Sequence, residues 1–158
     1  MQHRLYIDPK RKFAFIIDTL FGSNISQELP LADLEFIYSK RTGRIKHVVY
    51  KGKIIATLRP DGGIALTLEG ASLLLKTNKI IGNCIIIRND IKEFISNGSS
   101  VFCKHVIFVG NNIKIGDEVL VLDENNNLLA VGRSVLTSDM IKVFKRGVAV
   151  KIRHAIND

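Results

Sequence analysis

The sequence predicts an α+β N-terminal domain, made of helices and a small antiparallel sheet, followed by a mostly-β domain that closes into a compact barrel. A helical period opens the chain, short β-branched runs fill much of the rest, and a polar break separates two differently patterned parts. With 158 residues, 46% of them hydrophobic, and a mean hydropathy of +0.16, the chain can build two small cores. We expect the two domains to comprise residues 1–98 and residues 99–158.

An amphipathic helix and a strand meander account for most of the N-terminal part. Apolar side chains recur at helical spacing over residues 9–21, with Asp8 placed to cap the start and Gly22 to end it. Three strand-like runs are separated by turn signals, at residues 34–38, 45–50 and 53–58. A short helix at residues 71–75, a strand at residues 83–88 and a turn capped by Asp90 follow. We therefore expect a three-stranded meander beside the opening helix.

Short strands dominate beyond the polar, Gly- and Ser-containing break at residues 97–100. They are expected at residues 101–103, 106–109, 118–123, 128–135 and 148–153. The third and fourth of these form the clearest hairpin, because the polar residues 124–127 join them. Thr137 is placed to start a helix through residue 144, and Gly147 separates that helix from the final strand. Many short strands with little helix predict a barrel.

Composition and motifs exclude several classes of protein. No apolar run approaches the roughly 20 residues of a bilayer-spanning helix, and residues 1–9 lack the features of a secretory signal, so we expect a cytoplasmic protein without a membrane partner. Cys84 and Cys103 lie in apolar runs and are interpreted as buried hydrophobic residues; their spacing permits a disulfide, but a cytosolic location argues against one. No zinc-ligand spacing, phosphate-binding loop or nucleophile elbow is present, so we expect no metal, no cofactor and no catalytic residues.

Positive charge is the clearest chemical signal. The balance of 23 Lys and Arg against 15 Asp and Glu gives a net charge of +8, which favours a polyanionic partner through counterion release. Residues 40–60 hold seven basic and no acidic side chains, among which Arg41, Arg44 and Lys46 are candidate RNA contacts. Because strand alternation need not place these groups in one patch, a solvated basic edge is the alternative interpretation.

The closing segment is basic as well. Its cationic residues are Lys142, Lys145, Arg146, Lys151 and Arg153, whereas residues 117–124 hold four acids. A barrel with charge segregated in this way would orient a polyanion and repel it from the acidic side. The alternative is that these charges are solvated on two unrelated faces.

Several segments of the chain together resemble a known family. The C-terminal part carries SVFCKHV at residues 100–106, IGDEV at 115–119, LAVGR at 129–133 and KRGVAV at 145–150. This pattern, over residues 99–154, resembles a PUA domain. The preceding RTGRI at 41–45, TLRPDG at 57–62 and LTLEGA at 66–71 are similar to the domain that comes before PUA in archaeosine-type tRNA-guanine transglycosylases. The resemblance implies a PUA-like pseudobarrel that binds folded RNA chiefly by shape and backbone.

The resemblance also implies which residues line an RNA groove. They lie where the chain enters the barrel: Phe102, Lys104, His105, Lys114 and Gly116. We add Lys145, Arg146, Lys151 and Arg153 from the basic closing segment. The alternative interpretation of His105, which adjoins an apolar strand, is a structural role. A glycine before an aspartate, as at Gly116, is equally typical of a plain turn.

These observations predict a non-catalytic RNA-binding protein that recognises tRNA or another structured RNA and assists a separate tRNA-modifying enzyme. The catalytic barrel of the transglycosylases, with its aspartates and zinc cysteines, needs a longer chain than this one. The alternative is a protein-interaction subunit of an RNA-modifying complex. A small enzyme built on Cys103, Lys104 and His105 is disfavoured, because adjacent residues of a strand point in opposite directions.

Overall fold

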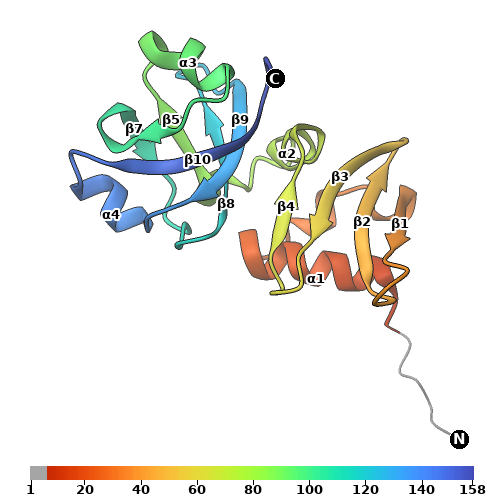
Figure 1. Ribbon diagram of the computed structural model, residues 1–158. Coiled ribbons are helices and arrows are strands. Elements are labelled where there is room, and N and C mark those ends of the chain that lie inside the picture. The colour runs from red at the N-terminus through yellow and green to blue at the C-terminus, as the bar shows by residue number, and fades with distance from the viewer. Residues whose placement is uncertain (1–6) are drawn as a thin grey trace, which may run out of the picture.

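The computed structural model describes residues 7–158, which form a four-stranded sheet backed by helices and then a six-stranded sheet (Figure 1). Residues 1–6 belong to the predicted first domain and to the segment interpreted as lacking a secretory signal, and they lie outside the described residues. Among residues 7–158, no helix combines the length and the apolar character that crossing a bilayer requires. The predicted order, an α+β part followed by a mostly-β part, is confirmed.

Helix α1 (Pro9–Phe21) forms where its period predicts. The Asp8 carboxylate accepts a hydrogen bond from the Lys10 N–H at 3.0 Å, and Gly22 ends the helix with a φ of +137°. A side chain would be strained at that φ, which explains the glycine. The face that packs on the first sheet consists of Phe13, Ile17 and Phe21.

The first sheet is an antiparallel meander of four strands. Its order is β1 (Leu34–Tyr38), β2 (Ile45–Tyr50), β3 (Lys53–Leu58) and β4 (Ile64–Leu66). The prediction missed β4, because three residues are too few to display alternation. Helix α2 (Leu68–Leu75) begins at Thr67, whose hydroxyl accepts from the Gly70 N–H at 3.1 Å, and it packs against β3.

The second sheet wraps into a nearly closed pseudobarrel. Its strand order is β6 (Val101–Phe102), β10 (Val148–Ala155), β9 (Leu128–Ser134), β8 (Glu118–Leu122), β5 (Cys84–Ile87) and β7 (Val106–Val109). β5 and β8 are parallel, and the other pairs are antiparallel. Two short helices accompany the sheet, α3 (Lys92–Ser96) and α4 (Ser138–Val143). As predicted, Thr137 caps α4, its hydroxyl accepting from the Met140 N–H at 3.3 Å.

The chain passes from one sheet to the other before the predicted boundary at residues 97–100. β5 is hydrogen-bonded to β7 and β8, and its Ile85 and Ile87 are buried in the core of the pseudobarrel. Residues 97–100 instead form the turn after α3, where the Gly98 N–H donates to the Ile95 carbonyl at 3.0 Å and Gly98 has a φ of +99°. The polar composition that suggested a linker therefore belongs to a tight turn inside the second unit.

The two units share an apolar core and a polar junction. Leu120, Leu122 and Val131 of the pseudobarrel pack in the same buried cluster as α1 and the first sheet. At the outer edge of β4, the Leu66 N–H donates to Glu118 Oε2 at 2.9 Å, and the Leu66 carbonyl accepts from the Arg153 guanidinium at 2.7 Å. The two units are thereby fixed relative to each other.

Candidate nucleic-acid interface

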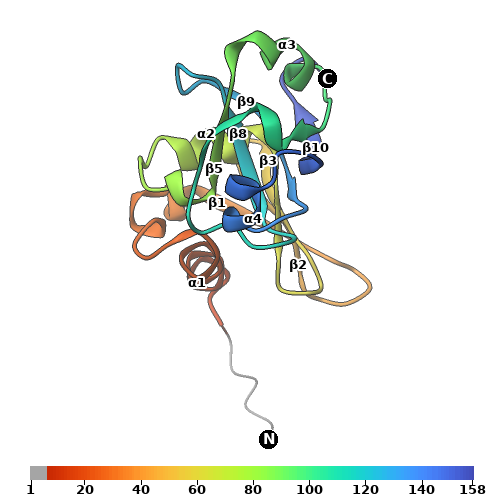
Figure 2. The same ribbon diagram turned by 90° about the vertical axis from the view of Figure 1, so that its left-hand side faces the viewer.

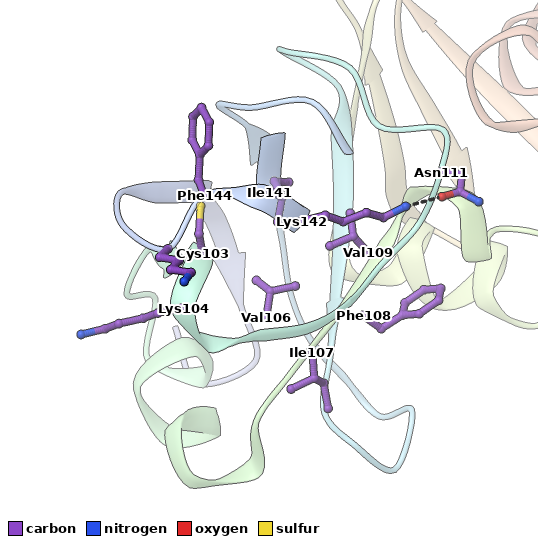
Figure 3. Close-up of a pocket in the computed structure, with 11 residues that line it drawn as sticks. Cys103, Lys104, Val106, Ile107, Phe108, Val109, Asn111, Ile141, Lys142 and Phe144 are labelled. Atoms are coloured by element: carbon purple, nitrogen blue, oxygen red, sulfur yellow. Dashed lines mark hydrogen bonds between the residues drawn. The ribbon is translucent and has the colours of Figure 1, made fainter. Parts of the chain in front are cut away.

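An open groove of about 710 Å³ lies between β7 and α4 (Figure 3). Val106, Val109 and Ile141 contribute an apolar floor. Three lysines also line the groove, namely Lys104, Lys142 and Lys145. No acidic side chain is among its lining residues, so the groove presents positive charge beside an apolar surface.

Hydrogen bonds around Ser138 set the width of this groove. The Ser138 hydroxyl donates to the Gly110 carbonyl at 2.6 Å, and the Ile113 N–H donates to the same hydroxyl at 3.0 Å. These contacts attach the start of α4 to the loop that follows β7. Lys142 Nζ then crosses the groove to donate to Asn111 Oδ1 at 2.7 Å. The two walls are therefore held by the fold before any ligand binds.

Aromatic side chains are exposed at the groove. Phe108 and Phe144 retain 39% and 44% of their surface, although both are large and apolar. They lie on opposite sides of Val106 in Figure 3, and Ile107 projects from the strand between them. Cationic groups together with exposed aromatic faces suit nucleic acid, because phosphates pair with the first and bases stack on the second.

Phe102 and His105, which the resemblance places in the RNA groove, are not among the residues that line this groove, although each is a chain neighbour of residues that do. Their rings meet edge to face with centroids 6.4 Å apart. Arg88 donates to His105 Nδ1 at 3.2 Å, so that nitrogen carries a lone pair. Burial, together with the positive charges of Arg88 and Lys104, lowers the pKa of His105. Arg88 was missed by sequence reasoning, because it ends a predicted strand and meets its partner 17 residues along the chain.

The turn containing Lys114 and Gly116 lies outside the lining of the groove. Gly116 has a φ of +88°, and its carbonyl accepts from Arg133 Nε at 3.2 Å. The Lys114 N–H donates to the Asp117 carboxylate at 2.9 Å, while the Lys114 side chain is exposed. Glycine is therefore required here by the turn, and the structure does not bring this turn together with Lys104.

The four cations of the closing segment that are predicted to contact RNA differ in their surroundings. Lys145 lines the groove, and Arg146 and Lys151 are exposed. Arg153 has a different role from the predicted RNA contact, because its guanidinium binds both carboxylate oxygens of Glu118, one of them at 2.6 Å. The Glu118 side chain is 1% exposed and that of Arg153 is 30% exposed. A cation engaged in this way is not free to bind phosphate.

Arg41 and Arg44 lie in the connection between β1 and β2, Lys46 lies near the start of β2, and all three are exposed. Figure 1 shows β1 and β2 at one end of the molecule and α4 at the other, so these cations do not join the groove. Within residues 7–158, none of the three forms an ion pair. The basic hairpin is thus a second positive surface, separate from the first.

Both cysteines are free and buried, as predicted. Burial raises the pKa of Cys84 to about 12 and also raises the pKa of Cys103, which lines the groove. In the part of the chain that the structure describes, no group of three or more His, Cys, Asp or Glu side chains is arranged to hold a metal ion.

Known protein families match both units. Residues 83–156 match the PUA domain, and residues 12–79 match the patch-forming domain C2 of tRNA-guanine transglycosylase. The chain is 37% identical to the tRNA-guanine(15) transglycosylase of Thermoplasma volcanium over 142 residues, which cover 89% of this chain and 22% of that protein. It is 33% identical to the tRNA-guanine(15) transglycosylase of Thermococcus kodakarensis over 148 residues, which cover 92% of this chain and 25% of that protein. The chain thus spans about a quarter or less of the length of these relatives.

Solved structures share the fold over nearly the whole chain. A hypothetical protein from Pyrococcus horikoshii superposes with a TM-score of 0.73 and 22% identity, covering 100% of this chain and 96% of that one. A conserved PUA domain protein from Thermoplasma acidophilum gives a TM-score of 0.66 and 21% identity, covering 96% of this chain and 93% of that one. The chain therefore consists of a patch-forming C2 domain followed by a PUA domain, and it is homologous to the C-terminal part of archaeal tRNA-guanine(15) transglycosylase.

Proposed function

We propose that this protein binds folded RNA, with tRNA as the first candidate, through the lysine-lined groove of its PUA domain. The PUA domain and the homology to a tRNA-guanine transglycosylase support a role in RNA binding and tRNA modification. The observation that carries the proposal is the lining of the groove, where Lys104, Lys142 and Lys145 are exposed and no acid competes with phosphate. A-form RNA displays phosphates and 2′-hydroxyls along its backbone, so cations on a preformed groove recognise its shape more than its sequence.

The chemistry of the groove favours binding over catalysis. Cys103 is its nucleophilic side chain, and desolvation raises the pKa of its thiol. A protonated thiol is a poor nucleophile, because the thiolate is the reactive form. Lys104, Lys142 and Lys145 supply positive charge without an adjacent carboxylate or imidazole in the lining that could act as a general base. We therefore infer that the groove holds RNA without reacting with it.

The relatives extend this proposal to a biological context. They are tRNA-guanine(15) transglycosylases, and the chain is homologous to their C-terminal part. We infer that the RNA held here is a tRNA on which a separate catalytic unit performs the modification. The competing role, a protein-interaction subunit of such a complex, is tested by capturing partners with and without ribonuclease. A partner lost after ribonuclease treatment supports the RNA-mediated role, and a retained partner supports the competing one.

The groove is tested by the triple variant Lys104→Gln/Lys142→Gln/Lys145→Gln in a tRNA titration at several salt concentrations. The logarithm of the association constant falls linearly with the logarithm of the salt concentration, and each lost phosphate contact makes this slope shallower by about 0.9. We expect the slope to fall by about 2 to 3 and the affinity to fall about tenfold or more.

The matched control removes three exposed lysines that lie outside the groove, Lys12→Gln/Lys53→Gln/Lys76→Gln. Its net charge equals that of the groove variant, so nonspecific attraction is the same in both. Equal losses in the two variants, or an unchanged slope in the groove variant, would refute binding through the groove.

A further inference from the structure

The basic tip, which we define as Lys40, Arg41, Arg44 and Lys46, consists of an ordered turn and the start of β2. The Ser39 N–H donates to the Arg44 carbonyl at 2.7 Å, and the Gly43 N–H donates to the Ser39 carbonyl at 2.8 Å. The Ser39 hydroxyl also accepts from the Thr42 N–H at 3.3 Å. Lys40, Arg41 and Arg44 are exposed on this turn and Lys46 is exposed at the start of β2, so a ligand that binds them need not order the backbone first.

The surroundings of the basic tip suit a nucleic acid. Exposed Ile37 and Tyr38 lie at the end of β1 that leads into the turn. Tyrosine offers an aromatic face for base stacking, and arginine binds phosphate in a bidentate manner. Residues 40–60 carry no acidic side chain, and Asp61, which follows them, pairs with Arg59 at 3.5 Å. The charge of the basic tip is therefore not neutralised locally.

The groove and the basic tip are kept apart by a rigid junction. Leu66 of β4 is hydrogen-bonded to Glu118 and Arg153 of the pseudobarrel, and Asn112 donates to the Leu20 carbonyl at 2.9 Å. The apolar cluster that spans both units leaves little room for hinge motion. In Figure 1, α4, which lines the groove, and the β1–β2 hairpin, which carries the basic tip, lie at opposite ends of the molecule, and in Figure 2 the end of the sheet at β2 extends past the pseudobarrel.

The distance between the groove and the basic tip sets a minimum length for an RNA that contacts both. A compact chain of this length has a radius of gyration of about 15 Å and is therefore roughly 40 Å across. One turn of a DNA duplex is about 34 to 36 Å long, and a turn of an A-form RNA duplex has a length of the same order. A stem shorter than about one turn that occupies the groove cannot also reach the basic tip.

We propose that the basic tip is a second RNA contact and that the protein thereby selects RNA longer than about one helical turn. This inference rests on the proposed function, since the groove provides the first contact. Contacts made simultaneously by a rigid protein reinforce each other, because the second forms without a further loss of translational freedom. Long RNA then gains affinity from the basic tip, whereas short RNA does not.

The experiment measures the affinity of the full chain for two RNA stems of about 8 and about 20 base pairs, chosen to lie below and above one turn. Arg41→Gln/Arg44→Gln removes two cations of the basic tip. The matched control, Lys51→Gln/Lys53→Gln, removes two exposed cations near the β2–β3 turn, at the other end of the same strands. A long stem offers more positions at which the protein can bind, which raises its apparent affinity. This effect is the same for the wild type and for each variant, so it cancels when the two are compared on the same RNA.

We expect Arg41→Gln/Arg44→Gln to weaken binding of the long stem about tenfold and to leave the short stem unchanged. The control should change neither by more than about twofold. Equal losses of affinity for both stems would overturn the selection by length, and no loss of affinity for the long stem would overturn the second contact; neither result bears on the groove. Failure of the groove is recognised separately, because the groove variant would then bind both stems as the wild type does.

Discussion

Removing the Arg153 side chain should destabilise the fold, because Arg153 completes the junction at β4. β4 is the edge strand of the first sheet, so the groups on its outer side have no strand partner. Glu118 accepts from the Leu66 N–H, and Arg153 donates to the Leu66 carbonyl as well as to Glu118. The ion pair thus satisfies an open strand edge in place of a neighbouring strand. In Arg153→Ala, the Glu118 carboxylate stays buried without its counter-ion.

The size of the effect follows from the burial of the two partners. Breaking a fully buried pair by deleting one partner costs about 3 to 5 kcal/mol, because the remaining charge is desolvated. The Arg153 side chain is 30% exposed, so water screens part of the interaction. We therefore expect a loss of about 2 to 3 kcal/mol in the free energy of unfolding. For a chain of this size, each kcal/mol lowers Tm by about 2 to 4 °C, which gives a decrease of roughly 5 to 10 °C.

Thermal unfolding followed by circular dichroism at neutral pH measures this decrease. The control is Lys151→Ala on the same strand, whose exposed side chain should change the stability by no more than about 0.5 kcal/mol. Glu118→Met/Arg153→Met should recover part of the loss, because a buried pair replaced by apolar residues leaves no unpaired charge. An Arg153→Ala protein that unfolds within about 2 °C of the wild type would refute the role of the ion pair.

Two further predictions concern proton linkage and helix packing. Burial and the neighbouring Arg88 lower the pKa of His105 in the free protein, whereas RNA phosphates nearby would raise it. RNA binding should therefore be accompanied by uptake of a proton at His105. The affinity for RNA should then rise as the pH falls from about 7 to about 5.5. His105→Gln should flatten this profile in a titration series, and a flat wild-type profile would contradict the linkage. In Gly70→Ala, the new Cβ would overlap the Ile55 carbonyl oxygen, so we expect a loss of about 2 kcal/mol or more in urea unfolding. Ser72→Ala, at an exposed position of the same helix, should have almost no effect, and equal losses in the two would rule out the overlap.

The elements that the sequence predicted well are those with local causes. Helix α1 is capped at Asp8 and ends at Gly22, and both residues directly flank the segment whose apolar side chains recur at helical spacing. The start of α4 follows from Thr137 in the same way, because a hydroxyl that caps a helix acts within three residues. The hairpin of β8 and β9 is also local, since a short polar turn sets its pairing.

The errors concern contacts between distant segments. β5 pairs in parallel with β8, and Cys84 lies opposite Leu120, so nothing near β5 in the sequence indicates the sheet to which it belongs. The predicted boundary consequently fell at a tight turn rather than at the change of sheet. The groove also depends on contacts between segments that are distant in the sequence. Lys142 contacts Asn111, 31 residues away, and it lines the groove only because α4 packs beside β7.

Whether a cation of this protein stabilises the fold or stays free on the surface depends on its burial and its partners rather than on its position in the sequence. Lys151 and Arg153 are two residues apart on β10, yet one is exposed and the other holds a buried carboxylate. Under the proposed function, only cations free of such partners would release counterions, so the salt dependence of RNA binding should reflect the groove and the basic tip instead of the net charge of +8. Glu118 and Arg153 instead hold the junction at Leu66, and this junction fixes the separation between the groove and the basic tip.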